Sequence, residues 1–170
     1  TLPATLDSLT QQTLQPAEYV FVDSGSTDST LSLLPAGSIL HRYAGDTFNF
    51  SEALNQGLVH VTCDYLLIIS SHSALAHPAA IEQAVHLLET NPEIGAVYFS
   101  PEKSGELTAE IVDRRNFNGF NGLWNTCSIV RVPLLRERQF RPEVFSAEDQ
   151  EWAGWLIHCR GMATARIDGA

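Results

Sequence analysis

Short apolar blocks recur along the chain, separated by polar residues, and each block predicts a strand. Residues 19–22 and 95–99 are compact runs of strand length, residues 39–40 (Ile-Leu) are a short one, and residues 128–132 (Ser-Ile-Val-Arg-Val) are the last clear strand candidate. Residues 65–69 (Tyr-Leu-Leu-Ile-Ile) contain no polar alternation, which is typical of a strand buried on both faces of a sheet. These five runs form the predicted sheet.

Apolar residues with helical spacing lie between the predicted strands. The spacing of Leu2, Leu6 and Leu9 predicts a first helix, and further helices are expected after residues that suit a helix start: Ser24–Asp28, Ser51, Pro78 and Ser146–Asp149. Strands that alternate with helices favour a mainly parallel sheet covered on both faces. In such sheets ligands bind at the carboxyl ends of strands, so Asp23 and the polar residues 70–73 are candidate site residues.

Residues 100–122 break the alternation. They hold Pro101, Gly105, Gly119 and the pair Arg114-Arg115, and we expect them to form a long loop over the sheet edge. An exposed, solvated pair is the simpler explanation of the two arginines. The alternative is that they reach an anionic ligand when the loop closes.

Composition narrows the classes of partner. The 170 residues are 44% hydrophobic and 18% charged, as in one globular domain with a substantial core. The net charge of −10 speaks against nucleic acid or an anionic membrane as the main partner, because phosphates need a basic footprint. The first 102 residues contain 11 acidic residues and a single basic one, Arg42.

The cysteines and the longest apolar run favour a cytoplasmic protein. Cys63, Cys127 and Cys159 show no metal or disulfide spacing, and we expect reduced thiols. The longest aliphatic run, residues 66–69, is far too short to span a membrane, so we expect no transmembrane segment and no signal peptide. The chain begins at Thr1 without a methionine, as if cut from a longer one.

Five segments follow one another in an order that resembles the family 2 glycosyltransferases, rhamnosyltransferase-like members in particular. They are residues 22–30, 48–57, 64–73, 125–131 and 145–152. The resemblance implies an inverting enzyme with a GT-A-type (Rossmann-like) α/β/α sandwich and a mainly parallel sheet. It implies a single domain over residues 1–170, with a nucleotide-binding part at about 1–100 and an acceptor and catalytic-base part at about 101–170.

The implied function is the transfer of a sugar from a nucleotide-diphospho-sugar to a hydroxyl acceptor in bacterial surface polysaccharide assembly. The acceptor would be a saccharide or a lipid-linked saccharide, reached at the inner face of the membrane. By resemblance, Asp23 reads the nucleobase and Ser24 lines the nucleotide pocket. Ser51 and Asn55 share one helical face that approaches the donor, but Leu54 stands where many relatives carry an arginine that holds the diphosphate.

The family's D-x-D metal signature falls on Ser70-Ser71-His72, so both carboxylates are missing. Three interpretations of His72 stay open. It ligates a divalent cation (Mn²⁺ or Mg²⁺) in place of the second aspartate, it donates a hydrogen bond to the diphosphate without metal, or it is a spectator. Ser70 and Ser71 would line the donor site in the first two.

Asp149 matches the family's general base, which deprotonates the acceptor hydroxyl. Acidic residues in a first helical turn also complement the helix dipole, and Ser146 with Asp149 has capping-box spacing. That simpler explanation suits Glu148 and Glu151. Trp152 and Trp155 are expected in the core.

The resemblance also implies a chain truncated at both ends, lacking the first strand of the fold and stopping at residues 166–170 before a last strand. Two other functions stay open. One is a non-catalytic sugar-nucleotide-binding or interaction module that has lost the metal site. The other is a nucleotidyltransferase of related fold, which predicts a glycine-rich basic loop near the start, and none is present in these residues.

Overall fold

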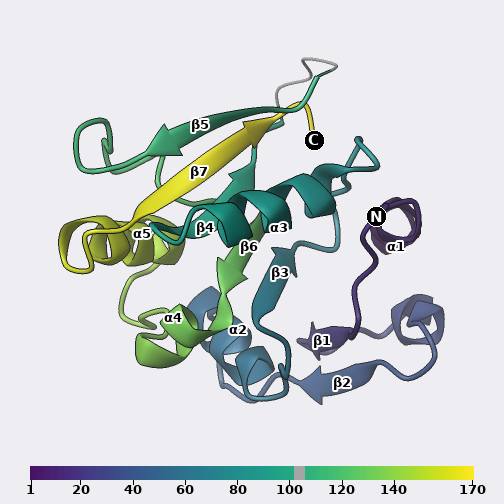
Figure 1. The fold of residues 1–170 in the computed structure, drawn as a ribbon. Helices are drawn as coiled ribbons and strands as arrows, with labels where there is room; N and C mark the ends of the chain where they lie inside the picture. The colour runs from purple at the N-terminus through teal and green to yellow at the C-terminus, as the bar shows by residue number, and fades with distance from the viewer. Residues whose placement is uncertain (102–105) are drawn as a thin grey trace.

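The computed structural model describes residues 1–101 and 106–170. Helices and strands alternate along most of the chain (Figure 1). In chain order they are α1 (Leu2–Thr10), β1 (Val20–Asp23), the 3-10 helix η1 (Ser29–Leu33), β2 (Ile39–Arg42), α2 (Phe50–Leu58), β3 (Tyr65–Ile69), α3 (Ala80–Thr90), β4 (Ile94–Phe99), β5 (Thr108–Val112), β6 (Cys127–Arg131), α4 (Val132–Glu137), α5 (Glu148–His158) and β7 (Ala163–Asp168).

The larger sheet has five strands in the order β3-β6-β4-β7-β5. Among the strands of this sheet that the structure describes, β4 and β7 pair in parallel, whereas β3–β6, β4–β6 and β5–β7 are antiparallel. The prediction of a mainly parallel sheet is therefore wrong for these strands. The crossover through α3 does set β3 and β4 in the same direction, but β6 inserts between them and runs the other way.

Two strands were not predicted. Residues 108–112, expected in a long loop, form β5 at the sheet edge, and four of its five residues are exposed, so no buried apolar run marks it. Residues 163–168, for which no strand was predicted, form β7 between β4 and β5. Its buried positions are mostly small residues, which give a weak strand signal in the sequence.

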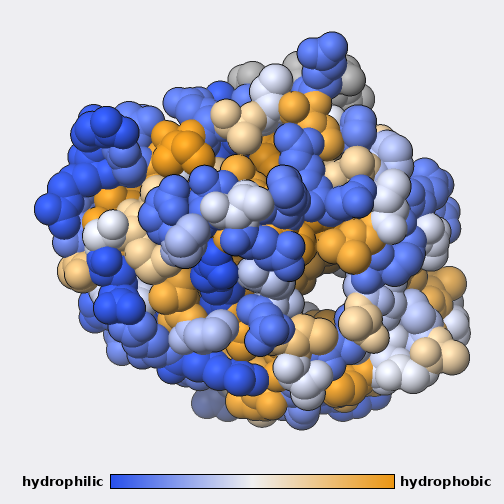
Figure 2. Space-filling view, in the orientation of Figure 1, coloured by the Kyte–Doolittle hydropathy of each residue, from blue (hydrophilic) through white to orange (hydrophobic). Residues whose placement is uncertain are grey.

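β1 and β2 form a separate parallel pair that packs against α2. Among the described residues, no strand pairs with the second edge of β1 or of β3. Figure 2 shows an opening through the molecule beside these strands, with hydrophobic surface at its rim. β3 contributes Leu66 and Ile68 to the hydrophobic cluster on one face of the sheet and Leu67 and Ile69 to the cluster on the other, so both faces are covered as expected. Of the five residues only Ile68 is buried, because β3 lies at a sheet edge.

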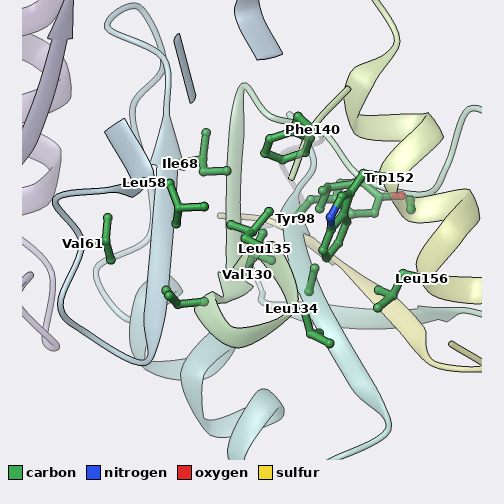
Figure 3. Close-up of a cluster of buried hydrophobic side chains, with 14 residues drawn as sticks. Leu58, Val61, Ile68, Tyr98, Val130, Leu134, Leu135, Phe140, Trp152 and Leu156 are labelled. Carbon is green, nitrogen blue, oxygen red and sulfur yellow. The ribbon is translucent and has the colours of Figure 1, made fainter. Parts of the chain in front are cut away.

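Two hydrophobic clusters cover the two faces of the larger sheet and make an α/β/α sandwich. On one face, α2, α4 and α5 pack around Trp152 and Tyr98, both fully buried (Figure 3). On the other face, α3 and α1 pack around Leu88 and Val97. Trp152 is a core residue as predicted, and its indole N–H donates to the carbonyl of Arg138, which satisfies its one polar atom.

Candidate functional site

Asp149 lies in the first turn of α5, partly buried. Its Oδ2 accepts a hydrogen bond from the backbone N–H of Asn125 at 3.2 Å, and its Oδ1 accepts from the N–H of Gln150 at 2.7 Å. Burial is the main influence and raises the pKa of Asp149 above its ordinary value, although the two N–H donors oppose it. A carboxylate held away from water with a raised pKa is suited to accept a proton.

The start of α5 is not explained by capping. Its N-cap residue is Ala147, which makes no side-chain cap, and Ser146 adopts a positive φ of 63°. The capping-box explanation of Ser146 and Asp149 is therefore wrong. A left-handed non-glycine residue costs about 1–2 kcal/mol, so the chain enters this helix through a strained turn.

The loop of residues 122–125 clamps the start of α5, a feature that the sequence did not reveal. The side-chain oxygen of Gln150 accepts from the N–H of Gly122 at 2.9 Å, and its side-chain nitrogen donates to the carbonyl of Leu123. The side chain of Asn125 donates to the buried Glu148 at 3.4 Å. Asn125 and Gln150 therefore fix the position of Asp149. In the sequence, the one indication of these contacts is that Asn125 begins the segment 125–131, which resembles family 2 glycosyltransferases.

The Ser70–His72 turn lies directly beside this clamp. The N–H of Ser70, just past the end of β3, donates to the carbonyl of Thr126 at 3.0 Å, and Thr126 follows the residue that holds Asp149. The Ser70 hydroxyl lies 3.0 Å from Nδ1 of His72, and Ser71 and His72 are exposed. The structure thus brings the predicted base and the predicted donor turn to the same end of the sheet.

The hydrogen bond between Ser70 and Thr126 is what joins the two predicted sites. It links the carboxyl end of β3 to the loop that enters β6, and that loop carries Asn125. Two segments that are distant in the sequence are therefore held together by a backbone contact, whereas the side chains of Ser71 and His72 stay open to solvent.

The residues at the turn do not fit a divalent cation. Ser70, Ser71 and His72 offer two hydroxyls and one imidazole, whereas Mn²⁺ and Mg²⁺ prefer carboxylate and other oxygen ligands. Within residues 1–101 and 106–170, no group of three His, Cys, Asp or Glu side chains is arranged to hold a metal ion. The hydroxyls and the imidazole can instead donate hydrogen bonds to an anion.

Asp23 ends β1 and is held by its own turn. Its oxygens accept from the N–H groups of Gly25 at 3.2 Å and Ser26 at 3.1 Å, and Arg42 lies 3.6 Å away. The hydrogen bonds from Ser26 are the main reason that the pKa of Asp23 is lowered, so this buried carboxylate is ionised at neutral pH. Ser24 beside it is exposed. Asp28 caps η1 by accepting from the N–H of Thr30, as the capping interpretation predicts.

Ser51 and Asn55 are used to position another segment of the chain. The Ser51 hydroxyl donates to the carbonyl of Arg141 at 3.0 Å, and Asn55 makes two hydrogen bonds with the backbone of Phe140, at 2.7 and 3.1 Å. Ser51 is 1% exposed, so the expected donor contact does not fit its burial. It does not cap α2 either, because the N-cap residue is Asn49.

Arg131, which ends the segment 125–131, and the pair Arg114-Arg115 all make contacts within the fold. Arg131 reaches inward, where it donates to the carbonyls of Ile94 and Leu88 and lies over the ring of Tyr65. Arg114 donates to the carbonyl of His158 at the far end of α5, and Arg115 pairs with Asp113. Arg114 and Arg115 are thus explained by contacts within the fold.

The structure does not join all the predicted residues into one site. No hydrogen bond or ion pair between described residues links the Asp23 turn to Asp149 or to the Ser70–His72 turn. A shallow hollow of about 720 Å³ lies beside residues 44–47 and α2, and Asn55 is among its lining residues. None of the described helices has the length and apolar character needed to cross a membrane.

Comparison with known proteins supports the resemblance. The family model "Glycosyl transferase family 2" matches residues 1–159. Over 119 residues the chain is 27% identical to the O-antigen chain rhamnosyltransferase RfbN of Salmonella typhimurium, covering 68% of this chain and 38% of that protein.

Solved structures show the same fold. The S. aureus TarS 1–349 complex with UDP superposes with a TM-score of 0.75 at 20% identity, covering 98% of this chain and 53% of that one. The mannosyltransferase PcManGT from Pyrobaculum calidifontis, in complex with GDP-Man and Mn²⁺, gives 0.68 at 23% identity, covering 91% and 47%. This chain therefore spans about half the length of these structures and less of RfbN. The GT-A fold is confirmed, and the chain belongs to glycosyl transferase family 2.

Proposed function

We propose that this chain is the transferase part of an inverting glycosyltransferase that moves a sugar from a nucleotide-diphospho-sugar to an acceptor hydroxyl. The observation that carries the proposal is Asp149, a partly buried carboxylate with a raised pKa, fixed by the N–H of Asn125 at the end of the sheet where the Ser70 turn lies. Because the chain belongs to glycosyl transferase family 2, the reaction that this carboxylate would assist is glycosyl transfer.

Asp149 acts as the general base. One of its oxygens takes the proton of the acceptor hydroxyl as that oxygen forms a bond to the anomeric carbon of the donor sugar. The bond between the anomeric carbon and the diphosphate breaks on the opposite face, so the configuration inverts and the nucleoside diphosphate leaves. Gln150 and Asn125 keep the carboxylate in place for this step, because they tie α5 to the 122–125 loop.

The donor lies across the carboxyl ends of β1 and β3. Asp23 accepts from a base N–H, and Ser24 lines the nucleotide pocket, while Ser70, Ser71 and His72 donate to the diphosphate. Ser51 and Asn55 do not contact the donor themselves; they position residues 140–141 through hydrogen bonds to the backbone. Residues 1–100 then form the nucleotide-binding part and residues 101–170 the acceptor and base part. No step of this mechanism is assigned to a metal, since the donor set does not fit one.

The acceptor is a saccharide or a lipid-linked saccharide in bacterial surface polysaccharide assembly, reached from the cytoplasm at the inner face of the membrane. Support comes from the relative named as an O-antigen chain rhamnosyltransferase. The alternative is a non-catalytic module that binds sugar nucleotides or another protein. Its support is the absence of a metal-holding cluster among the described side chains.

Calorimetry with a panel of UDP-, GDP- and dTDP-sugars, each with and without Mn²⁺, tests the proposal. We expect one nucleotide class to bind and its affinity to fall in Asp23→Ala, because the base N–H loses its acceptor. Ser32→Ala, an exposed serine of η1, is the control and should bind as the wild type does. Failure of every sugar nucleotide to bind would contradict the enzyme and leave the interaction module.

A further inference from the structure

Arg42 ends β2 at the position directly opposite Asp23 in the β1–β2 register. Its guanidinium nitrogen Nη1 lies 3.6 Å from Oδ2 of Asp23. The arginine side chain is 68% exposed, whereas that of Asp23 is 7% exposed. A cation therefore lies at the surface, beside the carboxylate to which the proposed function assigns the nucleobase.

The guanidinium of Arg42 keeps its hydrogen-bonding capacity. The contact with Asp23 is longer than a hydrogen bond, and no residue in the described ranges accepts a hydrogen bond from the Arg42 side chain. The oxygens of Asp23 accept from the N–H groups of Gly25 and Ser26, so the carboxylate does not depend on Arg42 for its hydrogen bonds. An exposed pair of this kind contributes little to stability, so Arg42 is free to bind elsewhere.

The distribution of charge in the first part of the chain makes this arginine a candidate for binding an anion. It is the one basic residue in residues 1–102, which also hold 11 acidic residues. A nucleoside diphosphate is anionic, and the described acidic and histidine side chains form no group that could place a metal against it. Other arginines already make contacts within the fold. Arg131 hydrogen-bonds in the core, Arg138 pairs with Glu151, and Arg166 pairs with Glu110 and Asp168.

We propose that Arg42 binds the donor diphosphate. The Ser70–His72 turn has no carboxylates that could hold a metal ion against the phosphates, and the guanidinium of Arg42 supplies the positive charge instead. The planar guanidinium presents paired N–H donors that match two phosphate oxygens. The side chain leaves its loose contact with Asp23 and turns to the phosphates, so base and diphosphate are recognised by neighbouring residues on paired strands. This inference rests on the proposed function, because it concerns the same donor.

Calorimetry of Arg42→Ala and Arg42→Lys with UDP, GDP and dTDP tests the inference, and NMR titration with uridine, guanosine and thymidine runs beside it. We expect Arg42→Ala to weaken binding of the preferred diphosphate by about 10- to 100-fold, as the loss of a charge-assisted contact does. Binding of the matching nucleoside should change less than about twofold, because a nucleoside has no phosphate for the guanidinium to contact. Lysine keeps the charge without the planar fork and should recover part of the affinity.

The matched control is Arg160→Ala, which removes an exposed arginine paired with Glu137 after the far end of α5. It changes the net charge equally and should leave diphosphate binding unchanged. If Arg42→Ala weakens the nucleoside and the diphosphate equally, Arg42 acts only through Asp23 and the inference is wrong. Unchanged diphosphate affinity overturns it too, while the proposed function stands. Absence of all nucleotide binding by the wild type overturns both.

Discussion

Gly122 packs so closely against α5 that a single methyl group there should displace this helix, which carries the proposed base Asp149. A Cβ at this position would lie 2.5 Å from Cβ of Ala153 and 2.6 Å from Cε2 of Phe117. Carbon atoms in contact are normally about 3.5–4.0 Å apart, so the overlap is about 1 Å. The Ala153 methyl cannot rotate away, and the loop or the helix must therefore move.

Two consequences follow for Gly122→Ala. Forcing a methyl into packed surroundings costs about 1–3 kcal/mol, which lowers the melting temperature of a chain of this size by about 2–12 °C. The N–H of Gly122 also holds Gln150, next to Asp149. A displacement of about 1 Å at a catalytic group lowers activity by about 100-fold, and we expect a loss of that order in the turnover rate.

Gly154→Ala is the matched control, because it adds the same methyl to α5 itself. A Cβ there would lie 3.6 and 3.7 Å from the ring of Phe117, at ordinary contact distance. Alanine inside a helix is better than glycine by about 0.5–1 kcal/mol, so this variant should be more stable than the wild type. Thermal melts and urea titrations of the three proteins measure the difference. A Gly122→Ala protein as stable as Gly154→Ala would refute the packing argument.

Three further predictions concern single side chains. Asp149→Asn should raise the melting temperature near pH 8 and lose that advantage near pH 3. Because the pKa of Asp149 is raised in the folded protein, its ionised carboxylate destabilises the fold only when the pH rises above the ordinary pKa of an aspartate. A difference in melting temperature that stays constant across pH would contradict this. Arg131→Ala should cost about 2–4 kcal/mol in urea unfolding, because the carbonyls of Ile94 and Leu88 lose their donor, and a loss below about 0.5 kcal/mol would argue against a structural role. His72→Ala should weaken diphosphate binding by about 3- to 10-fold in calorimetry with unchanged stability, since the side chain is exposed; unchanged binding would make His72 a spectator.

Local patterns predicted the elements that carry a strong apolar signal. Residues 65–69 form β3 as expected, since five consecutive apolar residues favour a strand whatever covers it. The pairing partners were not predictable in the same way. The insertion of β6 between β3 and β4 depends on contacts between distant segments, and the helix–strand alternation around α3 contains no information about it.

One predicted site residue, Asp149, has a carboxyl group whose burial and raised pKa suit its predicted role, whereas the contacts that hold it in place were not predictable. The order of the motifs led to Asp149, and the structure gives it a raised pKa. The clamp by Asn125 and Gln150 joins segments that are distant in the sequence, which no local pattern reveals. Ser51 was expected to face the donor, yet helical spacing alone could not show that residues 140–141 cover that face.

Release of nucleoside diphosphate from a panel of UDP-, GDP- and dTDP-sugars, compared between the wild type and Asp149→Asn, tests the central claim most directly. Loss of a general base lowers the rate by about 100- to 10,000-fold, and melts of both proteins establish that the variant is folded. The account predicts turnover of one sugar nucleotide by the wild type and a loss of that size in the variant. Full turnover by folded Asp149→Asn would contradict it.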